Sequence, residues 1–188
     1  MDAGAKPADA AERVSALAFR QALGHFCTGV TVVTSAVDDV PVGFACQSFA
    51  AVSLDPPLVL FCPGKQSRTW PMIERAGRFC VNILAGDQAP VSALFGSRGE
   101  GKFEQATWSA SASGMPVLDG VLTWIECTLH AVHDAGDHFI VVGAVEALGG
   151  PDTRSPLLFH RGQYTVTAPP PVRAVESWLA WSRPDDWI

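Results

Sequence analysis

The chain has 188 residues, 48% of them hydrophobic, which suits one domain with a single buried core and leaves little room for a second domain. Its net charge of −6 and the even spread of its 13 lysines and arginines argue against nucleic-acid binding, which needs clustered positive charge. Its apolar runs are far shorter than the roughly 20 residues that cross a bilayer, so we expect a soluble protein with no membrane segment.

The N-terminus and the cysteines both favour a cytoplasmic protein. Residues 1–14 are rich in alanine, contain both charge signs and lack the positive and then apolar regions of a secretory signal, so we expect a disordered tail there. Reduced thiols in the core are the favoured interpretation of the cysteines, because they form an odd set without a C-x-x-C pair. These cysteines are Cys27, Cys46, Cys62, Cys80 and Cys127.

The first part of the chain predicts one helix followed by three antiparallel strands. Apolar residues recur at a near-helical period between Ser15 and Phe26, and Ser15 is available as the N-cap. Beyond this helix, runs of β-branched residues separated by Asp and Pro turns predict strands. The predicted strands cover residues 30–37, 41–53 and 58–63.

The middle of the chain predicts two short helices around one strand, and then a long loop. Ser67 caps the first helix, which runs through Ala76. Residues 78–84 form the strand, and Asp87 opens the second helix. The stretch 96–120 is rich in glycine, serine and alanine and has no steady period, so we expect mostly loop, either mobile or closing over a ligand.

The last part contains the clearest hairpin of the sequence. Two strand-like runs, 121–133 and 138–148, flank the polar turn 134–137. A final strand pair surrounds Arg161-Gly162. Residues 168–188 then form a proline-rich spacer and a tail with several tryptophans.

So many short strands with so few short helices predict a mainly β fold, an antiparallel barrel rather than a parallel α/β sheet. Closing the sheet would also protect its edges from aggregation. The barrel domain is predicted to span 15–167, between the two tails.

The sequence lacks the usual catalytic signatures. It has no G-x-S-x-G, no H-E-x-x-H, no Walker sequence and no glycine fingerprint that joins a strand to a helix. A reaction carried by bound cofactors, such as hydride transfer between stacked rings, would explain this absence because it needs no protein nucleophile. The glycine-rich, basic run 95–103 is a weak phosphate-loop candidate, and a flexible lid is the favoured interpretation.

The segment 41–49 has the composition of a slot for flat rings. Gly43 and Ala45 would let a ligand approach the backbone closely. Gln47 and Ser48 then place polar groups within an apolar run. A strand bend with buried polar caps explains the same residues equally well.

A second candidate lies where a strand gives way to a helix. There, backbone N–H groups, hydroxyls and a guanidinium can converge on one anion. The residues concerned are Lys65, Ser67, Arg68 and Thr69. The alternative, an ordinary capped helix with exposed charges, is slightly favoured by these residues alone.

The turn from His133 to His138 contains two histidines and two aspartates, which suit a metal by ligand type alone. We expect no metal. Asp137 can instead orient His138, whose ring would then stack on a ligand or hydrogen-bond to it. An exposed histidine without a role is the remaining alternative.

The same segments resemble the flavin reductase-like family, which has the FMN-binding split-barrel fold. The resemblance covers about Phe19 to Tyr164 and rests on the order and spacing of its segments. These are F-x-x-x-L-G-x-F-x-T-G-V-T-V-V-T at 19–34, G-F-A-C-Q-S-F-A-A-V-S-L-D-P-P-L at 43–58, F-C-V-N-I-L at 79–84, K-F at 102–103, G-D-H at 136–138 and R-G-x-Y at 161–164.

The resemblance implies an antiparallel Greek-key split β-barrel with a few short flanking helices, which assembles as a homodimer. It implies that His138 faces the nicotinamide of a bound dinucleotide and that the run from Arg161 to Tyr164 lies near the flavin. The flavin contacts that it implies are Val42, Gly43, Phe44, Ala45, Gln47, Ser48, Cys62, Pro63, Gly64, Arg68, Thr69, Arg161 and Tyr164.

The resemblance also implies a function. Members of this family use NADH or NADPH to reduce FMN or FAD, and the reduced flavin then leaves for a separate oxygenase. The segments 38–49, 56–63 and 133–139 resemble reductases whose oxygenases hydroxylate a phenolic, steroid-derived substrate. The alternatives are an oxidase of the same fold that holds FMN tightly, or a flavin-binding module or plain β-barrel without catalytic activity.

Overall fold

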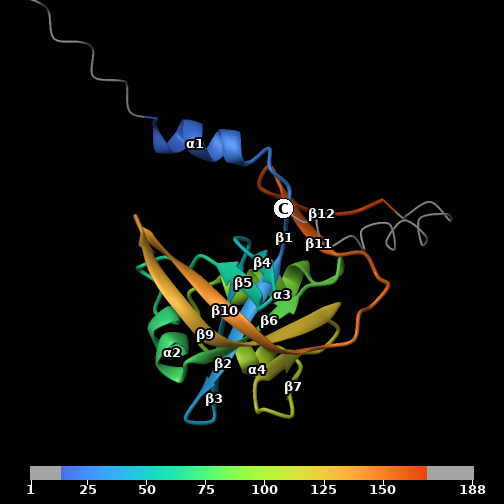
Figure 1. Ribbon diagram of the computed structural model, residues 1–188. Coiled ribbons are helices and arrows are strands. Elements are labelled where there is room, and N and C mark those ends of the chain that lie inside the picture. Colours follow the sequence, from blue (N-terminus) through green and yellow to red (C-terminus); the bar gives the residue numbers. More distant parts are fainter. Residues whose placement is uncertain (1–13, 169–188) are drawn as a thin grey trace, which may run out of the picture.

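The structure, a computed structural model, describes residues 14–168, and these form mainly antiparallel β-structure with four short helices (Figure 1). The mainly β fold expected from the sequence is confirmed. The tails expected at 1–14 and 168–188 lie outside the described residues except for Val14 and Ala168.

The helices are α1 (Ala16–Leu23), α2 (Trp70–Ala76), α3 (Ala89–Gly96) and α4 (Lys102–Gln105). The strands are β1 (Thr28–Gly29), β2 (Thr31–Val37), β3 (Val40–Cys46), β4 (Ala50–Leu54), β5 (Pro57–Phe61), β6 (Arg78–Ile83), β7 (Trp108–Ala110), β8 (Pro116–Leu118), β9 (Thr123–Ala135), β10 (His138–Leu148), β11 (Leu157–His160) and β12 (Gln163–Val166).

Seven strands form one antiparallel sheet in the order β3-β2-β6-β9-β10-β5-β4. Strands β3 and β5 lie near opposite ends of this order, yet the rings of Phe44 and Phe61 are 6.1 Å apart. The sheet therefore curls around a shared core into a barrel. No strand pairing joins β3 to β4 within residues 14–168, so the barrel is split between these two edges.

The barrel interior is an aromatic and aliphatic core. Phe61 is fully buried and meets Phe79 and Trp70 edge to face, with ring centroids 5.0 and 5.8 Å apart. A second buried cluster lies under α3 and includes Phe95 and Val32. Strand β2 contributes to both clusters, which explains why its residues are buried almost without interruption.

The segment 96–120, expected to be mostly loop, also contains α4 and the β7–β8 hairpin. Each strand of that hairpin has three residues, too few to show an alternating pattern. Buried Asn82 fastens the hairpin to the barrel, because its Oδ1 accepts the Leu118 N–H at 2.9 Å and its Nδ2 donates to the Thr34 hydroxyl at 3.0 Å. Most of the segment is loop, as expected, but α4 and the hairpin were not predicted, because this tertiary bond has no local sequence signal.

Three predicted boundaries also differ from the structure. The predicted strand 41–53 is two strands, β3 and β4, because residues 47–49 carry the chain from one edge of the split to the other. Helix α2 has Thr69 at its N-cap, although the Ser67 hydroxyl does accept the Trp70 N–H at 3.1 Å. Helix α3 is preceded by Gln88 rather than capped by Asp87.

The expected cap of α1 is confirmed, since the Ser15 hydroxyl accepts the Ala18 N–H at 3.1 Å. The cysteines are free. Cys46, Cys80 and Cys127 are buried as predicted, whereas Cys62 is half-buried and Cys27 is exposed, so the expected core position is wrong for Cys27. Burial raises the pKa of the Cys80 and Cys127 thiols to about 12, so both stay protonated at neutral pH.

Candidate active site

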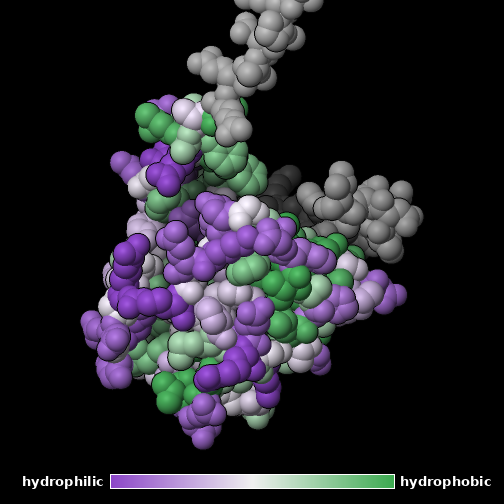
Figure 2. All heavy atoms as spheres, turned by 90° about the vertical axis from the view of Figure 1, so that its left-hand side faces the viewer, coloured by the Kyte–Doolittle hydropathy of each residue, from purple (hydrophilic) through white to green (hydrophobic). Residues whose placement is uncertain are grey.

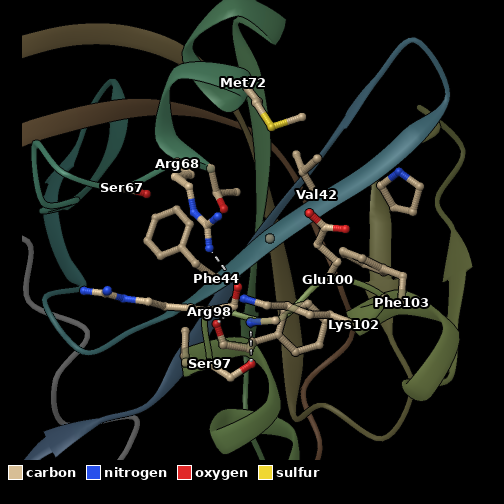
Figure 3. A pocket seen from close by; sticks show the side chains of 18 of the residues that line it. Val42, Phe44, Ser67, Arg68, Met72, Ser97, Arg98, Glu100, Lys102 and Phe103 are labelled. Atoms are coloured by element: carbon tan, nitrogen blue, oxygen red, sulfur yellow. Dashed lines mark hydrogen bonds between the residues drawn. The ribbon is translucent and has the colours of Figure 1, made fainter.

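A cavity of about 1130 Å³ opens beside β3 (Figure 3). Residues 40–45 of β3 form one wall, the turn 66–69 and Met72 of α2 form another, and residues 95–104 form the third. The barrel core supports the β3 wall, because the Phe44 ring packs against buried Phe61. The cavity therefore lies between the barrel and the segment that the sequence suggested as a lid.

The cavity brings together about half of the predicted flavin contacts. Those that line it are Val42, Gly43, Phe44, Ala45, Arg68 and Thr69. The predicted residues that do not line it are Gln47, Ser48, Cys62, Pro63, Gly64, His138, Arg161 and Tyr164.

Gly43 was predicted to let a ligand approach the backbone. In the structure, a Cβ at this position would lie 3.0 Å from the Val33 carbonyl oxygen and 3.2 Å from the Phe95 ring. The space left by the missing side chain is thus filled by protein atoms, and it lets α3 pack closely on β3. Gly43 positions the cavity wall, and its contact with a flavin stays a prediction.

A second group of predicted residues lies at the ends of β3 and β5. The Ser48 hydroxyl accepts the Cys62 N–H at 2.8 Å and lies 3.2 Å from the Cys46 thiol. This small network ties the two strand ends together. Gln47, next to it, is exposed.

His138 stands beside this second group. Gly64 forms a β-bridge with His138, and the Phe139 N–H donates to the Pro63 carbonyl at 2.9 Å. The His138 Nδ1 lies 2.7 Å from the Asp137 carboxylate. The hydrogen bond to His138 and the charge of its ring lower the pKa of the Asp137 carboxyl group. The predicted pairing of Asp137 with His138 is confirmed, and it holds a half-exposed imidazole in one orientation.

Arg161 and Tyr164 belong to the separate sheet of β1, β11 and β12. The Arg161 N–H donates to the Gly24 carbonyl at 2.9 Å, and the Tyr164 hydroxyl donates to the Ser92 hydroxyl of α3 at 2.9 Å. These bonds hold the β11–β12 hairpin against α1 and α3. Within one chain, neither Arg161 nor Tyr164 lines the cavity beside β3.

Three residues of the third wall, Arg98, Lys102 and Phe103, were not predicted as site residues. Lys102 Nζ donates to the Phe95 carbonyl at 2.9 Å, and Arg68 donates to the Arg98 carbonyl at 2.8 Å. Burial and the nearby charge of Arg68 lower the pKa of Lys102. The signal that could have found Lys102 was the glycine-rich basic run 95–103, which the sequence supported only weakly.

Within residues 14–168, no group of three His, Cys, Asp or Glu side chains is placed to hold a metal ion. None of the helices described there is both long and apolar enough to cross a membrane.

The chain matches the family model described as flavin reductase like domain over residues 23–168. It is 52% identical over 185 residues to the flavin-dependent monooxygenase reductase subunit HsaB of Rhodococcus jostii, with 95% of each chain covered. It is 44% identical over 146 residues to the FMN reductase (NADH) SmoA of Agrobacterium fabrum, with 78% of this chain and 83% of that protein covered.

Solved structures agree with this match. The crystal structure of nitrilotriacetate monooxygenase component B from Mycobacterium thermoresistibile superposes with a TM-score of 0.78 and 58% identity, over 80% of this chain and 86% of that chain. A match in sequence over most of the chain and a match in fold point to the same conclusion. The chain belongs to the flavin reductase-like domain family.

Proposed function

We propose that the chain is an NADH-dependent flavin reductase that supplies reduced FMN or FAD to a separate flavin-dependent monooxygenase. The names of two relatives support this, since one is a reductase subunit of such a monooxygenase and the other an NADH-dependent FMN reductase. The observation in the structure that carries the proposal is the cavity beside β3, which combines an apolar wall with three cationic residues, Arg68, Arg98 and Lys102.

The residues of this cavity fit a flavin. An isoalloxazine ring is flat and largely apolar, and Val42, Phe44 and Met72 offer an apolar surface from two walls. The phosphate of a flavin nucleotide is anionic, and Arg68 and Lys102 supply positive charge in the same cavity. The cavity thus offers complementary surfaces to both ends of the molecule.

A flavin and NADH, when bound, would supply the redox chemistry, a hydride transfer from the nicotinamide to the flavin ring. The chain contributes binding and orientation. The β3 wall is held rigid by the barrel core, and the segment 95–104 covers the cavity from the other side. His138, held by Asp137, is proposed to orient the nicotinamide.

An assay without any oxygenase tests this function. The purified protein is mixed with NADH and excess FMN, and the nicotinamide absorbance band is followed. We expect the absorbance to fall much faster than in a protein-free control, and no difference would contradict the proposal. A protein that stays yellow after desalting would instead indicate the tightly bound flavin of an oxidase or a binding module.

Replacing His138 by alanine should raise the apparent Michaelis constant for NADH, or slow hydride transfer, by roughly tenfold, because the dinucleotide loses an orienting ring. FMN affinity should be unchanged. His133→Ala is the matched control, since His133 is exposed on the same hairpin without contacting Gly64. Unchanged NADH kinetics in His138→Ala would remove this residue from the site.

We propose that the oxygenase partner acts on an aromatic substrate of the phenolic, steroid-derived kind. The segments 38–49, 56–63 and 133–139 support this through their resemblance to reductases of such systems. A coupled assay tests it: with this chain and NADH, a purified oxygenase component should hydroxylate a phenolic seco-steroid. Support for hydroxylation of simple phenols only would contradict the proposal.

We propose that residues 15–167 act as a homodimer. Helix α1 has eight residues and none of them is buried, with Leu17 and Leu23 68% and 55% exposed. Such a short helix is marginal by itself in water. It stands away from the barrel in Figure 1, and hydrophobic side chains are visible on it in Figure 2. Sedimentation equilibrium should give twice the chain mass, and a monomer would contradict the proposal.

We propose that the protein works in the cytoplasm. The free, buried thiols of Cys46, Cys80 and Cys127 suit a reducing compartment. Fractionation of the cells that make the protein tests this, and recovery from an extracytoplasmic fraction would contradict it.

A further inference from the structure

Two cysteines, Cys46 and Cys62, contact the same hydroxyl group. Cys46 is the last residue of β3, and Cys62 directly follows β5. The Ser48 hydroxyl lies 3.2 Å from the Cys46 Sγ and accepts the Cys62 N–H at 2.8 Å. Strands β3 and β5 lie near opposite ends of the sheet order, so the two cysteines meet across the split of the barrel.

The surroundings of the two thiols differ. Cys62 is half-buried and can be reached from solvent, whereas Cys46 is only 6% exposed. Burial raises the pKa of the Cys46 thiol, and the neighbouring Cys62 adds to this rise, although hydrogen bonds from Ser48 oppose it. A buried, protonated thiol is a poor first target for an oxidant, so Cys62 is the accessible member of the pair.

The pair lies between the two parts of the candidate site. Cys46 belongs to β3, whose residues 40–45 form one wall of the cavity. Cys62 lies two residues before Gly64, which forms a β-bridge with His138. A covalent bond between the two sulfurs would therefore act on the cavity wall and on the residue proposed to orient the nicotinamide.

We propose that Cys46 and Cys62 form a reversible disulfide that slows the enzyme when its reduced flavin is not consumed. This inference rests on the proposed function. Without a working oxygenase, molecular oxygen takes two electrons and two protons from free reduced flavin and becomes hydrogen peroxide. The oxidant thus arises from the enzyme's own product, and the disulfide would limit further production of it.

Two chemical steps lead to the disulfide. Hydrogen peroxide first oxidises the Cys62 thiol to a sulfenic acid, and one molecule of water is released. The Cys46 thiol then attacks the Cys62 sulfur, so that the S–S bond forms and a second molecule of water leaves. In a reducing compartment such a disulfide is transient, because cellular thiols reduce it again.

The disulfide would disturb the site through the two strand ends. A disulfide requires the Cα atoms to lie within about 7 Å of each other. Since the strand ends are already joined through Ser48, rotation of the two side chains and a small backbone shift would meet this requirement. Hydride transfer is sensitive to displacements of about 1 Å, so even a small shift of the wall or of His138 would slow it.

The first experiment locates the disulfide in protein treated with hydrogen peroxide. A protease that cleaves before aspartate separates Cys46 from Cys62 at Asp55, and Cys27 from both at Asp38. Mass spectrometry without reduction should find the peptides of Cys46 and Cys62 joined, and dithiothreitol should release them. Peptides of Cys46 and Cys62 that stay separate after peroxide treatment would overturn the inference.

The second experiment measures NADH oxidation with FMN before and after peroxide treatment. The rate of the unaltered protein should fall roughly tenfold or more and return with dithiothreitol. Cys62→Ser is compared with its own untreated rate and should be insensitive to peroxide. The control Cys27→Ser lacks an exposed thiol that does not line the cavity and should respond like the unaltered protein. Equal inactivation of Cys62→Ser would overturn the inference.

The third experiment tests the source of the oxidant. With NADH, excess FMN and oxygen but no oxygenase, the rate should decline during turnover as the joined peptides appear. Catalase removes hydrogen peroxide and should prevent both changes. A decline that catalase does not prevent would show that peroxide is not the oxidant and overturn the inference.

Failure of the inference and failure of the proposed function are distinguishable. A protein that oxidises NADH with FMN, but forms no bond between Cys46 and Cys62, is still a flavin reductase, and only the disulfide is wrong. A protein that oxidises no NADH before any peroxide is added contradicts the proposed function itself.

Discussion

Replacing Gly143 by alanine should destabilise the fold by about 1–3 kcal/mol, although it adds only one carbon atom. Gly143 lies in the middle of β10, where the pairing with β9 shifts register. An added Cβ would overlap the Phe79 ring and lie 3.0 Å from the Cys127 Cβ. Phe79 is fully buried, so its ring can move only by displacing other core side chains.

Urea denaturation of the variants measures this effect. Gly150→Ala is the matched control because an added Cβ there meets no atom within 4 Å, and its stability should change by less than about 0.5 kcal/mol. Adding Phe79→Leu to Gly143→Ala should cost less than the sum of the two single changes, since the smaller side chain makes room for the Cβ. A Gly143→Ala protein as stable as the original would contradict the prediction.

The parts of the fold that the sequence predicted correctly are those with local signals. The β2–β3 hairpin has a two-residue turn, Asp38-Asp39, in which both residues have positive φ, and Asp is suited to such turns. The long β9–β10 hairpin was predicted too, although its turn is Gly136-Asp137 rather than the whole of 134–137, because β9 continues to Ala135. In both hairpins, the residue types of the turn and of the adjoining strands are sufficient to predict the structure.

The parts that were missed depend on distant contacts. The break between β3 and β4 is visible only once the strand order places these strands at opposite edges of the barrel. The β7–β8 hairpin depends on Asn82, which is far away in the sequence. These are tertiary effects, which no window of neighbouring residues reveals.

The candidate site shows the same division. Residues 42–45 and Arg68 were predicted and do line the cavity, because they belong to segments with a recognisable pattern. Lys102 was missed, because only the fold brings it to the same cavity as Arg68, and the surrounding glycines suggested a lid. His138 and Ser48 were predicted but lie in a separate group of residues beside the ends of β3 and β5.

Replacing Phe61 by alanine should have the largest effect on stability, a loss of about 3–5 kcal/mol. Phe61 is fully buried and contacts the rings of Phe44, Phe79 and Trp70, at centroid distances of 6.1, 5.0 and 5.8 Å. Alanine would leave a cavity at the centre of this cluster. A domain of this size is stable by only about 5–15 kcal/mol, so the variant should unfold at much lower urea concentration.

The same change should weaken FMN binding in the molecules that remain folded. Phe44 lines the cavity proposed to bind flavin and rests on Phe61, so the wall would lose its support from the core. FMN affinity is therefore measured by titration and corrected for the folded fraction obtained from circular dichroism. Phe61→Leu fills much of the space and should keep more of both stability and affinity. An affinity unchanged after this correction would show that the wall does not depend on Phe61, because the β3 backbone alone would then suffice to hold it.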